Sequence, residues 1–217
     1  LTEYREKCRV GPYGITIQDY LSVKSAPVLT ERLNDSSSVK IFFTGRLVYY
    51  KGADVLLKAF RRVNGCELFI AGTGELEEQL KKYVRDKGLS GKVHFLGFLP
   101  DEQLKQAYAD CDIFVLPSTV KSEAFGIVQL EAMVYGKPVI NTRLDSGVPY
   151  VSVDGETGLT VSPGDEKALA SAISALARDN ELRERLGRNA SQRVKEAFRE
   201  EAVIKKLYSV LSEGVNI

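Results

Sequence analysis

The stretch VKIFFTGRLVYYKGADVLLKAF, residues 39–60, contains the pattern that decides the fold. Its first six residues are mostly β-branched or aromatic and end at Gly45, which is typical of a strand buried on both faces. After a turn containing a second glycine, Val55, Leu56, Ala59 and Phe60 recur at helical spacing. The stretch therefore predicts one β-α unit.

The same unit repeats along the chain. Apolar runs that end at or lie beside Gly or Pro predict further strands at 67–71, 92–96, 112–116, 138–141 and 158–161. Helical patterns lie between them, and Asp101 is the predicted N-cap of one of these helices. The strands start roughly 20 to 28 residues apart, as β-α repeats require. We expect a doubly wound, Rossmann-like α/β domain with about six parallel strands and helices on both faces.

The two ends of the sequence differ from this pattern. Residues 1–38 are rich in Pro, Gly and polar residues and predict an interdomain linker and leading segment. The repeats fill 39–197. Beyond Pro163 the sequence predicts helices over 166–178, 181–198 and 200–212. We expect the last unit of the chain, residues 198–217, to be a C-terminal helix that is separate from the repeats.

Composition excludes several classes of function. The 217 residues carry 30 basic and 29 acidic side chains, a net charge of +1, so no basic excess favours nucleic acid. No apolar run approaches the roughly 20 residues of a membrane span, and we expect no secretory signal. Cys8, Cys66 and Cys111 follow no zinc or redox spacing, which predicts reduced thiols in a cytoplasmic protein, the last two of them buried.

Ligands of open parallel sheets bind beyond the carboxyl ends of the strands. There the sequence has Gly45–Arg46, Lys51–Gly52, Gly72–Gly74, Gly97 and the run 117–126. Arginine and lysine beside glycines and a helix start suit an anion, most simply a diphosphate. Either basic residue taken alone would be read as solvated surface charge.

Two acids frame the helix that starts near Gly126. Glu123 and Glu131 are eight residues apart, or about 12 Å at helical rise, too far for a carboxylate dyad acting on one bond. The spacing suits the hydroxyl-bearing ends of an extended ligand. The alternatives are a helix-start acid for Glu123, and for Glu131 either a surface residue or a buried acid that needs a partner.

Other motifs are weaker. Gly72-Thr73-Gly74 lacks the third glycine of a dinucleotide fingerprint. Asp110-Cys111-Asp112 lies at the wrong end of its strand for this site and predicts a helix end and a strand start. His94, the single histidine, lies within a strand pattern and is predicted to be structural, so no His-based triad or zinc site is available.

The run SEAFGIVQLEAM, Ser122 to Met133, resembles the E-x7-E signature of family 4 retaining glycosyltransferases of the GT-B fold. Blocks at 43–60, 69–75, 93–104, 109–118, 136–142 and 155–173 resemble that family in order and spacing, and 10–20 resembles the segment that opens its C-terminal half. The resemblance implies a donor-binding domain, with the acceptor-binding N-terminal domain absent from this chain.

Carried over by motif, the resemblance implies the roles of the site residues. Arg46 and Lys51 would contact the donor diphosphate, Glu123 the transferred sugar and Glu131 the ribose. The catalytic residues would be Arg46, Lys51 and Glu123. The donor-binding positions would be Gly45, Arg46, Lys51, Gly74, Gly97, Phe98, Glu123, Ala124, Phe125, Gly126, Ile127 and Glu131. Such enzymes generally need no metal or cofactor.

The resemblance also implies binding partners, and two alternative functions remain open. The donor would be a GDP- or UDP-sugar, and the acceptor a glycan or lipid-linked molecule bound through the other domain, with peripheral association at the inner membrane face. Tyr150 stands where many relatives have Glu, which favours polysaccharide synthesis and mannosyl transfer, although a packing role is equally open. A sugar-nucleotide epimerase and a non-catalytic nucleotide-sugar-binding domain are the alternatives.

Overall fold

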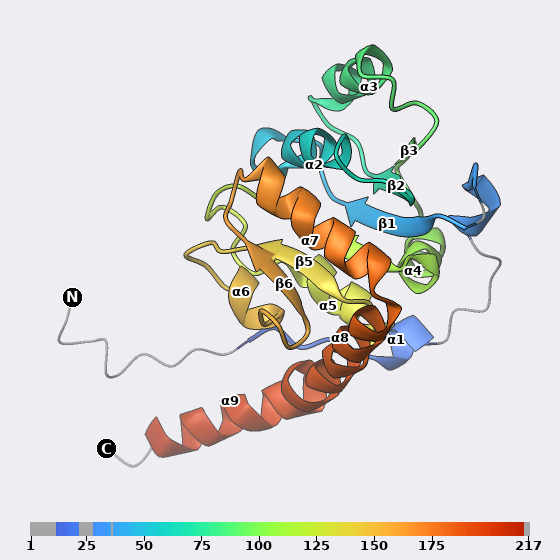
Figure 1. The fold of residues 1–217 in the computed structure, drawn as a ribbon. Coiled ribbons are helices and arrows are strands. Elements are labelled where there is room, and N and C mark those ends of the chain that lie inside the picture. The colour runs from blue at the N-terminus through green and yellow to red at the C-terminus, as the bar shows by residue number, and fades with distance from the viewer. Residues whose placement is uncertain (1–11, 22–27, 36, 215–217) are drawn as a thin grey trace.

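The computed structural model describes residues 12–21, 28–35 and 37–214. Its centre is a six-stranded, wholly parallel sheet with the order β3-β2-β1-β4-β5-β6 (Figure 1). The strands are β1 Val39–Thr44, β2 Cys66–Ala71, β3 Val93–Gly97, β4 Ile113–Val115, β5 Val139–Thr142 and β6 Gly158–Val161. The predicted doubly wound architecture is confirmed, with strand ends within two residues of the predicted ones.

The helices cover both faces of the sheet. They are α1 Gln18–Leu21, α2 Ala53–Phe60, α3 Glu77–Asp86, α4 Asp101–Asp110, α5 Ile127–Val134, α6 Val148–Val151, α7 Glu166–Arg178, α8 Asn180–Arg193 and α9 Glu200–Gly214, with short 3₁₀ turns at Thr30–Arg32 and Tyr49–Lys51 and a π-turn at Val194–Phe198. Strand β1 illustrates the two cores. Ile41 and Phe43 pack with α2, α3 and α7, whereas Phe42 packs with α4 and α5 on the other face.

Two sequence expectations about helix ends need correction. Asp101 is the first residue of α4 and caps nothing, because Pro100 occupies the N-cap position. The helix predicted over 181–198 ends as α8 at Arg193 and continues as the π-turn to Phe198. The domain boundaries at 38 and 197 remain predictions.

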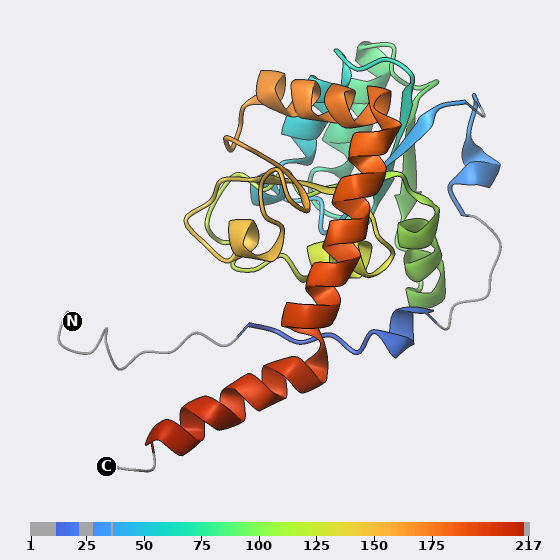
Figure 2. The ribbon, with the colours of Figure 1, turned by 60° about the horizontal axis from the view of Figure 1, so that its bottom comes forward.

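The leading segment lies beside the junction of α8 and α9. Ile15 forms a parallel bridge with Arg199, and its amide donates to the carbonyl of Phe198 at 2.8 Å. From this junction α9 projects away from the sheet and its covering helices (Figure 2). Residues 12–17 and the start of α9 are therefore held together by backbone hydrogen bonds.

The residues predicted to be structural have structural partners. Cys66 and Cys111 are buried free thiols, and burial raises their pKa to about 11 and about 12. Cys8 lies outside the described residues. Asp110 accepts hydrogen bonds from Leu29 and Thr30, and Asp112 accepts one from the amide of Lys40.

His94 also has a structural setting. Its Nε2 lies 2.5 Å from Oε2 of Glu67, and its ring stacks on Phe69. Glu67 is buried in β2 and accepts the amides of Asn34 and Asp35 as well. These contacts fasten the segment before β1 to the sheet.

Candidate functional site

A cavity of about 210 Å³ opens at the carboxyl ends of β1, β2 and β3. It is lined by Thr44, Gly45, Arg46, Ala71, Gly72, Thr73, Phe98, Leu99 and Leu104. Three predicted donor-binding residues, Gly45, Arg46 and Phe98, therefore share one cavity. The Arg46 side chain is exposed and Phe98 is 78% exposed, so a cationic group and an aromatic ring are both available to a ligand.

Close backbone contacts hold the loops around this cavity together. A Cβ on Gly72 would lie 2.1 Å from the carbonyl oxygen of Gly45, and one on Gly74 would lie 2.5 Å from that of Leu47. A Cβ on Gly52 would lie 2.0 Å from the carbonyl oxygen of Pro117. The loops after β1, β2 and β4 are thus in direct contact, and Gly74 packs against a backbone rather than lining the cavity.

Lys51 and Glu123 form an ion pair across the same edge of the sheet. Nζ of Lys51 lies 2.6 Å from Oε2 of Glu123, and the hydroxyl of Ser118 donates to the same oxygen at 3.0 Å. The two charged side chains are 15% and 10% exposed. The loop after β1 and the loop after β4 therefore bring a cation and an anion together, as the predicted convergence of strand ends requires.

Helix α5 begins beside this pair. Its N-cap is Gly126, with φ of 71°, and no side chain caps it. The left-handed conformation at Gly126 favours glycine, and a Cβ there would lie 2.6 Å from Cδ2 of Leu116, so that side chain would have to shift. The buried Gln129 fixes the turn from within, because its Nε2 donates to the carbonyls of Phe125 and Val148. The first amides of α5 are left to meet an anion.

Glu131, on α5, has two tyrosine partners that the sequence did not reveal. The hydroxyl of Tyr108 donates to Oε2 at 2.5 Å, and the hydroxyl of Tyr20 donates to Oε1 at 3.2 Å. Tyr108 is fully buried on α4, whose Leu104 lines the cavity described above. The sequence left open whether Glu131 is a surface residue or a buried acid that needs a partner. In the structure Glu131 is half-buried and has two hydrogen-bond partners. Tyr108 lies at a core-facing position of α4, and this position in the sequence does not indicate that its hydroxyl has a polar partner.

The remaining predicted positions surround these groups. Gly97 accepts the amide of Gly72 at 2.7 Å and precedes Phe98. Ala124 is exposed, and its carbonyl accepts the amide of Gly147 at 2.7 Å. The ring of Phe125 packs against Tyr13 and Phe198 and is half-buried, while Ile127 is 44% exposed.

One geometric assumption made from the sequence fails. The separation of Glu123 and Glu131 was estimated with helical rise, but only residues from Ile127 onward are helical. Glu123 lies in the turn before the left-handed Gly126. Glu123 therefore lies in a loop and Glu131 in a helix, so the rise of a helix does not give the distance between them.

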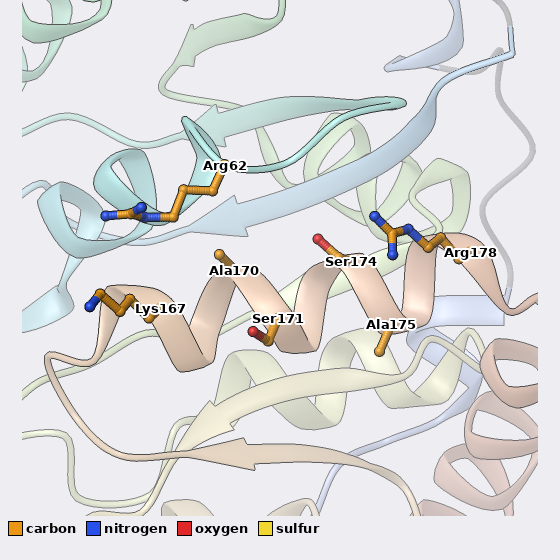
Figure 3. A pocket seen from close by; sticks show the side chains of 7 residues that line it. All are labelled: Arg62, Lys167, Ala170, Ser171, Ser174, Ala175 and Arg178. Atoms are coloured by element: carbon orange, nitrogen blue, oxygen red, sulfur yellow. The ribbon is translucent and has the colours of Figure 1, made fainter.

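A larger hollow lies elsewhere and contains none of these residues. It measures about 440 Å³ and is lined by Arg62 and six residues of α7: Lys167, Ala170, Ser171, Ser174, Ala175 and Arg178 (Figure 3). Arg62 is engaged by Glu166 at 3.3 Å. Lys167 and Arg178 stand near opposite ends of α7 (Figure 3).

Two features are absent from residues 12–21, 28–35 and 37–214. No group of three or more His, Cys, Asp or Glu side chains there could hold a metal ion. None of the helices in these ranges has the length and apolar character needed to span a bilayer.

The fold matches that of one class of enzyme, the GT-B glycosyltransferases. A structure of Anabaena HepE in complex with UDP superposes with a TM-score of 0.83 at 26% identity, covering 94% of this chain and 57% of that one. The same protein has been solved with UDP-glucose, and that structure superposes with a TM-score of 0.82 at 26% identity, over the same shares of the two chains.

Sequence comparison names the family. The family described as glycosyl transferases group 1 matches residues 30–193. A D-rhamnosyltransferase of Pseudomonas aeruginosa is 37% identical over 203 residues, 91% of this chain and 51% of that protein. An O-antigen chain mannosyltransferase of Escherichia coli is 31% identical over 218 residues, 99% of this chain and 57% of that protein.

The chain belongs to the glycosyl transferases group 1 family and has the fold of a GT-B C-terminal domain. It spans about half the length of the curated relatives it matches.

Proposed function

We propose that this chain binds the nucleotide-diphosphate sugar of a hexosyltransferase that retains anomeric configuration. The observation that carries the proposal is the Lys51–Glu123 ion pair beside the uncapped start of α5. A lysine has three donors, and the pair occupies one of them with Glu123. The others remain for a phosphate oxygen, with Glu123 next to the sugar that the phosphate carries.

The rest of the site matches the parts of such a donor. Arg46 would neutralise the diphosphate from the cavity side, and the backbone at 124–127 would donate to it. Phe98, beside Gly97, offers an exposed ring at the cavity where a base can stack. Glu131 retains lone pairs for the two ribose hydroxyls. The cavity thus lies between a base-binding surface and a diphosphate-binding edge.

The proposed reaction breaks the bond between the anomeric carbon and the diphosphate oxygen, which keeps the electron pair. An acceptor hydroxyl attacks from the same face and forms the new bond, and its proton passes to the departing phosphate. Arg46, Lys51 and the amides of α5 stabilise the charge that develops on the leaving group. Catalysis is then positioning and electrostatics, which needs no general base on this chain.

The proposal extends to the sugar, the nucleotide, the acceptor and the cellular setting. A hexose is supported by the rhamnosyl- and mannosyltransferase relatives, and the mannosyltransferase supports the lean toward mannose. The UDP complexes of HepE support a nucleotide donor, with GDP and UDP both to be tested. The acceptor, a glycan or lipid-linked molecule, would be bound by a partner domain. Buried, reduced thiols support a cytoplasmic setting.

Calorimetric titration with UDP, GDP and their hexose conjugates tests the donor site. We expect measurable binding of one nucleotide series, reduced about tenfold by Arg46→Ala through loss of one charge-assisted contact. Arg188→Ala is the matched control, because this exposed arginine on α8 pairs with Glu184 away from the sheet edge. Absence of binding by either series, or equal affinity of the Arg46→Ala and parent proteins, would refute the site.

A further inference from the structure

Two tyrosines that no motif assigns hold the acid at the far end of the proposed donor. Tyr108 donates to one oxygen of Glu131 at 2.5 Å, and Tyr20 donates to the other at 3.2 Å. A carboxylate has about four lone-pair positions, two on each oxygen. The tyrosines occupy one on each, so one acceptor position on each oxygen is left for a ligand.

Both phenols can act only as donors to the carboxylate. Burial and the negative charge of Glu131 raise the pKa of Tyr108 well above its ordinary value, and burial with the same charge raises that of Tyr20. Both hydroxyls therefore keep their protons at neutral pH. The carboxylate is therefore oriented by neutral donors, with no cation from the described part of the chain bound to it, and its charge can strengthen hydrogen bonds from a ligand.

Each tyrosine is itself held in place. The ring of Tyr108 packs edge-on against Phe42, with centroids 5.3 Å apart, and contacts Phe114 as well. The backbone carbonyl of Tyr20 accepts the hydroxyl of Tyr135 at 2.5 Å, and its ring lies under Nζ of Lys105 at 5.4 Å. One tyrosine is fixed by the core and the other by a docked surface turn, α1.

We infer that Tyr108 and Tyr20 are positioning residues that preset the Glu131 carboxylate to accept two adjacent hydroxyls of a nucleotide ribose. The inference rests on the proposed function, because it takes the ribose to be the ligand of Glu131. A carboxylate that is already held in place loses less conformational entropy on binding than a freely rotating glutamate side chain would. The tyrosines thus contribute to affinity for ribose without touching it.

Calorimetry with ribonucleotides and their 2′-deoxy and 3′-deoxy forms separates this role from a structural one. For whichever of UDP or GDP binds, we expect Tyr108→Phe to weaken the ribonucleotide about fivefold. Each deoxy form keeps only one of the two hydroxyls, so its affinity should fall by a smaller factor. Tyr20→Phe should act in the same direction by a smaller factor, because its hydrogen bond is longer. A purely structural loss would weaken all of these ligands alike.

Two further variants complete the test. Glu131→Gln should abolish the preference for ribose, and adding Tyr108→Phe to it should then have no further effect. Tyr83→Phe is the control, a half-buried tyrosine on α3 that packs with the other core. An unchanged ribose preference in both Tyr→Phe variants, with that preference lost in Glu131→Gln, overturns the inference and leaves the donor site standing. Failure of the unmodified chain to bind any nucleotide overturns both.

Discussion

Glu123 and Glu131 are the same residue type, eight positions apart, in opposite settings. Glu123 is 8% exposed and is paired with the ammonium of Lys51. Glu131 is half-buried and is held by two neutral phenols. The first carboxylate has its charge compensated within the protein, and the second keeps a negative charge that only hydrogen bonds satisfy.

The difference follows from local structure and has a chemical meaning. Glu123 lies in a turn where the loop after β1 can bring a cation to it, whereas Glu131 lies on a helix facing α4 and α1. A compensated acid beside an anionic diphosphate avoids repelling it. An uncompensated acid is appropriate where the ligand supplies hydroxyl donors.

The largest effect is expected from removing the compensating cation. Lys51→Met leaves Glu123 poorly solvated without its partner, so the free energy of unfolding should fall by about 3 kcal/mol. Urea denaturation measures this change. The double variant Lys51→Met with Glu123→Gln should recover most of the loss, and a double variant as unstable as the single one would contradict the pairing.

A second carboxylate away from the site gives a reference with purely structural partners. Burial opposes ionisation of Glu67, but the amides of Asp35 and Asn34 and the ring of His94 outweigh it and lower its pKa. A carboxyl whose folded-state pKa is depressed stabilises the fold above its unfolded pKa, near 4.5, and loses that contribution as pH falls through the folded value. Glu67→Gln should cost about 2 kcal/mol at neutral pH.

The pH profile of unfolding checks this second expectation. The difference in unfolding free energy between the parent and Glu67→Gln should shrink as the solution is acidified below pH 4.5. A constant difference across that range would mean that ionisation of Glu67 is not what the variant removes. Glu156→Gln, an exposed acid in the turn before β6, serves as the control.

The smallest effect concerns the neutral partner of Glu123. Ser118→Ala removes one hydroxyl donor while Lys51 remains, so the unfolding free energy should fall by only about 1 kcal/mol. Thermal unfolding at constant pH measures it. A loss as large as that of Lys51→Met would show that Glu123 depends on neutral donors in the way that Glu131 does, and the contrast would break.

The β-α repeat was predictable because parallel strands buried on both faces are nearly continuous apolar runs bounded by glycine or proline. The convergence of Arg46, Lys51 and Glu123 on one edge was predictable as well, because strand direction alone requires it. The N-cap at Asp101 was predicted wrongly. Pro100 and Asp101 are both common at helix starts, and the sequence alone does not decide which of them is the N-cap and which is the first helical residue.

The partners of Glu131 could not be predicted from this sequence. Tyr20 lies 111 positions away from it, and its hydroxyl reaches the site only because α1 docks on α5. Tyr108 occupies an apolar position of α4, where an aromatic ring is explained by packing alone. Contacts between distant segments are fixed by tertiary geometry, and no spacing rule encodes them.

The glycines that lock neighbouring loops together constrain how this edge can change. Gly52, Gly72 and Gly74 each press against the backbone of an adjoining loop, so lengthening or substituting one loop displaces the next. Altered donor preference is therefore easier to reach through outward side chains such as Phe98 than through loop grafting. A mutagenesis library aimed at sugar or base selectivity should diversify those side chains and keep the three glycines fixed.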